Sequence, residues 1–136
     1  MRARLDRELW RSNSLLCGVD EAGSGALAGP VVAAAVVMPH NRAIRGVNDS
    51  KLLSPNTRAR LNLVIRESAI AWAVGIAGPR AIDRVNILNA ALEAMARAIL
   101  RLAERPEIVL VDGLHAPAVD IPCRAVVGGD RLSYNI

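Results

Sequence analysis

The run VVAAAVVM at positions 31–38 most constrains the fold, because Pro30 and Pro39 enclose it. Proline interrupts both helices and the hydrogen-bond ladders of central strands, so the run has little room to extend. It is too short for a buried helix and rich in valine, which favours a β-strand. Apolar and polar residues do not alternate within it, and we therefore expect a strand that is buried on both faces of a sheet.

Segments of strand and helix character surround this run. A short amphipathic helix is expected within residues 1–13, and further strands are expected at 15–20, 69–78, 107–113 and 123–129. Ser54 and Pro55 are typical of a helix N-cap and first turn, which predicts a helix to about Ser68. A longer helix is expected from Pro79 to about Ala103, because apolar residues recur there every three or four positions, at Ile82, Val85, Leu88, Leu92, Met95, Ile99 and Leu102. The order β-β-α-β-α-β-β predicts an α/β fold with a mixed β-sheet flanked by helices.

The composition narrows the possible functions. Only 2% of the residues are aromatic, which argues against a surface that stacks single-stranded bases. The net charge of +4 permits a polyanionic partner without requiring one. Cys17 and Cys123 lack C-x-x-C spacing and are expected to be reduced core residues. The chain shows neither a signal peptide nor a membrane-spanning run, and we expect a cytoplasmic protein with no membrane partner.

Acidic residues follow two of the predicted strands. Asp20 and Glu21 follow the apolar start of the segment CGVDEAG, and Asp112 follows that of VLVDG, with a glycine at the end of each segment. If these strands are parallel neighbours, their carboxyl ends meet at one crevice and the acids crowd together. Clustered carboxylates repel one another unless cations are present, and oxygen ligands suit Mg²⁺ or Mn²⁺. The pattern predicts a metal site for phosphoryl transfer, in which Asp20 bridges the metal directly and Glu21 reaches it from the turn.

The same motifs have other interpretations, one of which the sequence excludes. The segment GSGALA at 23–28 fits a dinucleotide-binding fingerprint, but strand-like residues follow it where that fingerprint requires a helix, so we reject this function. The glycines are also compatible with a plain turn, and Glu21 with a solvated turn residue. The loop residues Asn48, Ser50 and Lys51 suit contacts to phosphate, although an Asx-turn before the helix explains the same pattern. His40 and His115 have no partner at metal-ligand spacing and are expected to be solvated.

Several motifs, taken in order, resemble the ribonuclease HII family. The segments that carry the resemblance are CGVDEAGSGALAGPVVAAAVV, NDSKLLS, AIDRVNILNAALEAM, VLVDG and VVGGDRLSYNI. The resemblance implies an RNase H-like fold and an endonuclease that cuts the RNA strand of RNA–DNA hybrids and cuts at ribonucleotides embedded in DNA. It implies that Asp20, Glu21 and Asp112 are catalytic residues that bind Mg²⁺ or Mn²⁺. It also implies substrate contacts, from Gly23, Ser24 and Gly25 to the ribose 2′-OH at the RNA–DNA junction and from Asn48, Ser50 and Lys51 to phosphates.

The chain departs from the family pattern in its loop and at its end. The family loop is typically Gly-Arg-Gly, whereas this chain has Ser24 between the glycines. We expect the family's fourth acid and its substrate-contacting Tyr to lie beyond Ile136. On this interpretation residues 1–136 form a C-terminally incomplete ribonuclease HII-type catalytic domain, monomeric or self-associating, with impaired cleavage. The alternatives are a non-catalytic nucleic-acid-binding remnant and another RNase H-like nuclease with an acidic site.

Overall fold

The computed structural model describes residues 4–11, 15–22, 30–40, 53–77, 84–129 and 136. Its elements, in chain order, are α1 (Arg4–Trp10), β1 (Leu16–Ala22), β2 (Val31–Val37), α2 (Pro55–Ser68), β3 (Ala71–Ala77), α3 (Arg84–Leu100), β4 (Ile108–Asp112) and β5 (Cys123–Val126). The predicted order of strands and helices is confirmed. Ser54 caps α2 as expected, because its side chain accepts a hydrogen bond from the Thr57 N–H at 3.2 Å.

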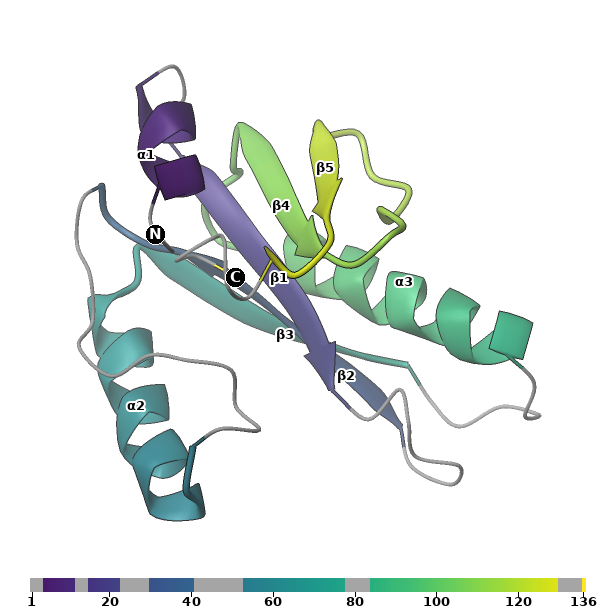
Figure 1. Cartoon of the computed structure of the whole chain (residues 1–136), viewed down its shortest axis with the longest axis horizontal. Helices are drawn as coiled ribbons and strands as arrows, with labels where there is room; N and C mark the ends of the chain where they lie inside the picture. The colour runs from purple at the N-terminus through teal and green to yellow at the C-terminus, as the bar shows by residue number, and fades with distance from the viewer. Residues whose placement is uncertain (1–3, 12–14, 23–29, 41–52, 78–83, 130–135) are drawn as a thin grey trace.

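The strands form one mixed sheet in the order β3-β2-β1-β4-β5 (Figure 1). β2 pairs antiparallel with both β1 and β3. β4 runs parallel to β1 on one side and to β5 on the other. The acidic ends of β1 and β4 therefore belong to neighbouring parallel strands, which is the arrangement that the sequence pattern predicts.

Helix α3 covers one face of the sheet and completes the main core. The helix contributes small residues to this contact, and the sheet contributes aliphatic residues such as Val19, Val37 and Val111. The buried residues of α3 are Ala90, Ala91, Ala94, Met95, Ala98 and Ile99. Leu88, which the apolar pattern places on the packed face, is 39% exposed, so that expectation is wrong for this residue. Alanines allow the helix to approach the sheet closely, and the buried stripe combines four alanines with Met95 and Ile99.

The contact is closest at Gly75 of β3. A Cβ atom at this position would clash with the backbone carbonyl of Ala94 and would lie 2.5 Å from the Ala98 nitrogen. Both atoms belong to the α3 backbone, which cannot yield without moving the helix. Arg97 of α3 and Arg101, the residue that follows the helix, donate to the carbonyl oxygens of Ile76 and Val74, at 2.5 and 2.9 Å respectively. These bonds occupy acceptors of β3, an edge strand of the sheet.

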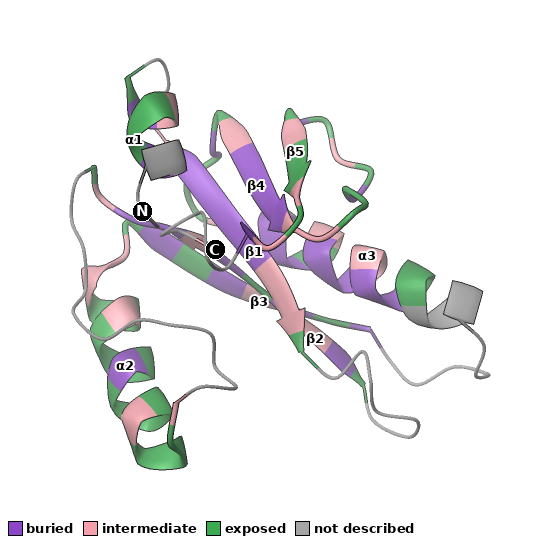
Figure 2. Ribbon diagram, viewed as in Figure 1, coloured by how far each residue is buried: buried purple, intermediate pink, exposed green. Residues whose placement is uncertain are grey.

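Within the described residues, the opposite face of the sheet is only partly buried (Figure 2). Trp10 of α1 packs with Leu16 and Leu110 at one end of this face. Along β2 the burial alternates, and Ala34 is exposed. The expectation that this strand is buried on both faces is therefore wrong: an apolar run hides the alternation that side chains follow along a strand.

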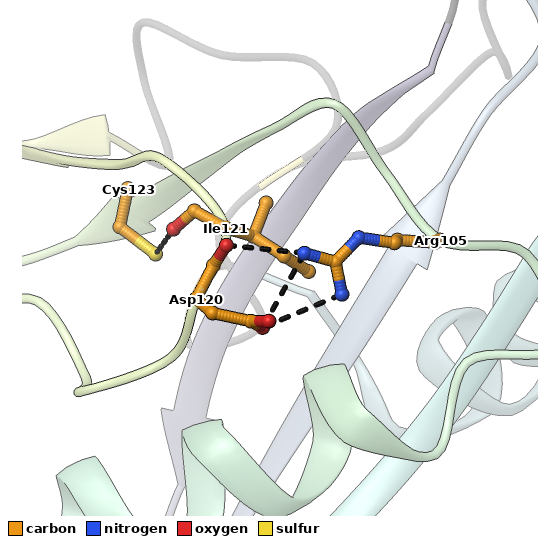
Figure 3. A network of polar contacts seen from close by, with 4 residues as sticks. All are labelled: Arg105, Asp120, Ile121 and Cys123. Carbon is orange, nitrogen blue, oxygen red and sulfur yellow. Dashed lines mark hydrogen bonds and ion pairs between the residues drawn. The ribbon is translucent and has the colours of Figure 1, made fainter.

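The connection between β4 and β5 is tied to the segment after α3 (Figure 3). Arg105 donates hydrogen bonds to the Asp120 carboxylate at 3.3 Å and to the Asp120 carbonyl oxygen at 3.0 Å. The Cys123 thiol donates to the Ile121 carbonyl oxygen at 3.3 Å. The ion pair is exposed and contributes at most about 1 kcal/mol, so its role is to fix where the connection enters β5.

Both cysteines are free thiols, as the sequence predicts. Burial raises the pKa of Cys17 to about 12 and also raises the pKa of Cys123. Among the described residues, no helix is long and apolar enough to cross a membrane.

Candidate metal centre

The site begins with the register between β1 and β4. Val19 pairs with Val111, so the next residues, Asp20 and Asp112, are neighbours where the pairing between β1 and β4 ends. Val19 and Val111 both face the core under α3. Because side chains alternate along a strand, the two aspartates project from the opposite face of the sheet. The predicted convergence of these acids is confirmed for this pair.

Asp20 lies in an environment that disfavours its charge. Burial is the main cause that raises the pKa of this carboxyl to about 7, and the neighbouring Asp112 and Glu21 carboxylates raise it further. The Glu21 backbone N–H opposes the shift, since it donates to Asp20 Oδ1 at 2.8 Å. A cation bound beside this half-buried carboxyl and its acidic neighbour would stabilise the charged form of Asp20.

Glu21 belongs to the strand rather than to a turn. β1 continues to Ala22, so the expectation that Glu21 reaches the site from a turn is wrong. Alternation places the Glu21 Cβ on the α3 side of the sheet, away from the Asp20 side chain. Its carboxyl nevertheless comes close to that of Asp20, because both the charge of Glu21 and a side-chain hydrogen bond with it are among the causes that raise the Asp20 pKa. Glu21 therefore lies near the aspartate pair although its Cβ is on the other face.

Asp112 is held by a contact that the sequence analysis did not anticipate. The Gly129 backbone N–H donates to Asp112 Oδ1 at 2.8 Å. In the return direction, the Gly113 N–H donates to the Val126 carbonyl oxygen at 3.0 Å. Two successive glycines after β5 signal a turn, but nothing in the sequence shows that this turn folds back onto the acid at the end of β4.

The chemistry of these donors fits a hard divalent cation. Asp20 and Asp112 offer only oxygen atoms, which suit Mg²⁺ or Mn²⁺ rather than a metal that prefers sulfur or imidazole. Within the described residues, no group of three or more His, Cys, Asp and Glu side chains has a metal-binding arrangement. The candidate centre is therefore limited to the Asp20–Asp112 pair and the neighbouring Glu21.

The shifted pKa predicts how the pH affects stability in metal-free buffer. Because the folded state raises the Asp20 pKa above its unfolded value of 3.8, the protonated form favours folding. This contribution is complete below pH 3.8 and is lost as the pH rises through about 7. We expect Asp20→Asn to raise the thermal midpoint above that of the unsubstituted chain by roughly 5 °C at pH 8, with little difference at pH 4. Melting curves of both chains across this range measure the effect, and a difference that does not change with pH would contradict it.

The remaining predicted site residues have different outcomes. Gly23, Ser24, Gly25, Asn48, Ser50 and Lys51 lie outside the described residues. His115 is exposed, as expected for a solvated loop residue. His40 is also exposed, and its ring packs on Trp10 with 5.4 Å between the ring centroids.

The mixed sheet, its flanking helices and the acidic strand ends define an α/β protein with an RNase H-like fold. Ribonuclease H2 from Pyrococcus horikoshii OT3 has a similar structure, with a TM-score of 0.65 and 25% identity over 82% of this chain and 61% of that chain. The family model for ribonuclease HII matches residues 17–135. The chain belongs to the ribonuclease HII family.

Curated relatives carry the same family name. Ribonuclease HII of Dechloromonas aromatica (strain RCB) is 56% identical over 116 residues, which are 85% of this chain and 59% of that protein. Ribonuclease HII of Idiomarina loihiensis is 48% identical over 116 residues, which are 85% of this chain and 62% of that protein. The chain thus spans about three fifths of the length of these relatives.

Proposed function

We propose that residues 1–136 act as a metal-dependent endonuclease domain of the ribonuclease HII type. Its substrates would be the RNA strand of RNA–DNA hybrids and DNA that contains embedded ribonucleotides, which it would cut on the 5′ side of the ribonucleotide. The observation that carries the proposal is the pair of acids, Asp20 and Asp112, on neighbouring parallel strands at the point where their pairing ends. Membership of the ribonuclease HII family supports the substrate class.

Asp20 and Asp112 would hold Mg²⁺ or Mn²⁺ through their carboxylate oxygens, with Glu21 as a further ligand or neighbour. When bound, such a metal stabilises the charge that develops on the attacking and leaving oxygens in phosphodiester hydrolysis. The chain's own contribution is placement. The Glu21 N–H fixes Asp20 Oδ1 and the Gly129 N–H fixes Asp112 Oδ1, so each carboxylate offers its remaining lone pairs in a set direction.

The substrate contacts proposed from the family resemblance lie in two loops. Gly23, Ser24 and Gly25 directly follow β1 and would place backbone groups against the ribose 2′-OH at the junction. Asn48, Ser50 and Lys51 would bind phosphates of the duplex, which position the substrate without reading its sequence.

A further acid is available within the chain. Asp130 follows Gly129 in the sequence, and Gly129 binds the Asp112 carboxylate. Asp130 lies outside the described residues, but this adjacency makes it a candidate for the fourth acid, as an alternative to a residue beyond Ile136. The cleavage activity of the Asp130→Asn variant separates these two candidates for the fourth acid. If Asp130 is a ligand, the variant should lose activity as Asp20→Asn does.

Ser24 should weaken binding at the RNA–DNA junction. A serine hydroxyl forms single hydrogen bonds, whereas arginine binds phosphate through two parallel ones. We expect Ser24→Arg to bind a duplex with one ribonucleotide about 10-fold more tightly, since a charge-assisted bidentate contact contributes roughly 1.5 kcal/mol. Fluorescence anisotropy in Ca²⁺ measures the affinity, and an unchanged dissociation constant would contradict the expected role of this position.

A cleavage assay tests the proposed function. The chain is incubated with Mg²⁺ or Mn²⁺ and a labelled DNA duplex that contains one ribonucleotide, alongside a duplex of the same sequence without it. We expect a single cut on the 5′ side of the ribonucleotide and an intact all-DNA control. Binding without cleavage, weakening steeply with salt, would instead favour a non-catalytic nucleic-acid-binding protein. Cleavage of all-DNA junctions would favour a different RNase H-like nuclease.

A further inference from the structure

The turn after β5 lies directly against the candidate metal centre. Gly128 has a φ of 67°, a left-handed conformation that favours glycine, and it directs the chain back toward the end of β4. Gly129 is buried, and its N–H meets Asp112 Oδ1 at 2.8 Å. The contact joins residues 17 positions apart in the sequence, so the turn brings a distant backbone donor to the acid.

Space as well as hydrogen bonding constrains Gly129. A Cβ atom at this position would lie 3.3 Å from Asp112 Oδ1 and 3.4 Å from Asp112 Cα. It would also lie 2.6 Å from Cδ1 of Ile136. A side chain at Gly129 would therefore collide with that of Ile136, whereas it would only be in tight contact with Asp112.

A second backbone bond joins the ends of the same two strands without touching the Asp112 side chain. The Gly113 N–H, one residue after Asp112, donates to the carbonyl oxygen of Val126, the last residue of β5. β4 and β5 are already paired up to Asp112 and Val126. The bond from Gly113 extends this pairing past the strand ends, and the bond from Gly129 extends it onto the Asp112 side chain.

We propose that Gly129 is a positioning residue for the metal centre, whose backbone N–H holds the Asp112 carboxylate in the orientation that binds the cation beside Asp20. The inference rests on the proposed function, since it assumes that Asp112 is a ligand. Groups that orient metal ligands typically change metal affinity 10- to 100-fold when removed. Gly129 can act this way without a side chain of its own.

The test replaces the N–H with an ester oxygen of similar size. Glycolic acid, incorporated in place of Gly129, converts the amide between residues 128 and 129 to an ester, which removes the donor and turns an oxygen lone pair toward the Asp112 carboxylate. The matched control carries glycolic acid in place of Gly113, which deletes a backbone bond of similar length to the Val126 carbonyl oxygen but leaves the bond to Asp112 Oδ1. Mn²⁺ affinity is measured by calorimetry on the whole chain, and thermal midpoints report stability.

We expect the ester at 129 to weaken Mn²⁺ binding at least about 10-fold. The ester at 113 should leave the Mn²⁺ affinity within about 2-fold of the unsubstituted chain. Both esters should lower the thermal midpoint by similar amounts. Equal affinities for both esters and the unsubstituted chain would overturn the role of Gly129 and leave the proposed function standing. An equal loss of affinity in both esters would also overturn it, because the effect would then be structural. An unsubstituted chain that binds no Mn²⁺ would overturn the proposed function itself, and the positioning role with it.

Discussion

Asp20→Asn should lower the rate of cleavage at an embedded ribonucleotide by at least about 100-fold in either Mg²⁺ or Mn²⁺. The amide keeps the shape of the side chain but removes a negative charge, and one of its oxygens is replaced by a donor that cannot bind a cation. Asp112→Asn should have a comparable effect, since its carboxyl is the neighbour of Asp20 across the two strands. Single-turnover cleavage with saturating enzyme measures the chemical step without the influence of product release.

The Asp20→Asn variant should lose cleavage activity while remaining folded. The folded state disfavours the charge of Asp20, so the neutral amide should be at least as stable as the acid near pH 8. Glu104→Gln is a suitable control, because Glu104 is an exposed acid and its change also removes one negative charge. We expect this control to cleave at the unsubstituted rate. Full activity of Asp20→Asn would mean that this carboxylate is not part of the reaction.

Gly75→Val should destabilise the chain by about 3 kcal/mol or more. The valine Cβ would enter the backbone of α3 at Ala94 and Ala98, and its methyl groups would require still more space. The helix would have to move away from β3, and the hydrogen bonds from Arg97 and Arg101 to that strand would lengthen. Since domains of this size are stable by only about 5–15 kcal/mol, the change removes a large part of the total.

Urea unfolding followed by circular dichroism measures this effect. Ala125→Val is the control, because Ala125 is an exposed position on β5 and valine favours strands. We expect the control to change the free energy of unfolding by less than about 0.5 kcal/mol. If Gly75→Val were as stable as the control, the close approach of α3 to β3 would be wrong.

The general fold could be predicted because its signals are local. The caps and prolines mark the ends of helices, and short apolar runs between them mark strands. The convergence of Asp20 and Asp112 was also predictable, since both acids follow apolar strands and parallel neighbours align their carboxyl ends. What such signals do not contain is the register between segments that lie far apart in the sequence.

Three features show this limit. The exposed face of β2 was missed because alanine and valine occur on both of its faces, so the run carries no polar mark of the open side. Leu88 was assigned to the packed face of α3 although the helix packs through its alanines. The bond from Gly129 to Asp112 depends on a turn that closes only after β5 has paired with β4, and the order of residues alone does not contain this pairing.

The most direct test of the metal centre is an anomalous difference map from a crystal of the chain soaked in Mn²⁺. The arrangement of β1 and β4 predicts a peak within about 2.0–2.6 Å of carboxylate oxygens from both Asp20 and Asp112. In the refined structure of the same crystal, the Gly129 nitrogen should remain within hydrogen-bond distance of Asp112 Oδ1, leaving the other carboxylate oxygen to the metal. A well-ordered Mn²⁺ bound elsewhere, with these two carboxylates free of metal, would contradict the central claim.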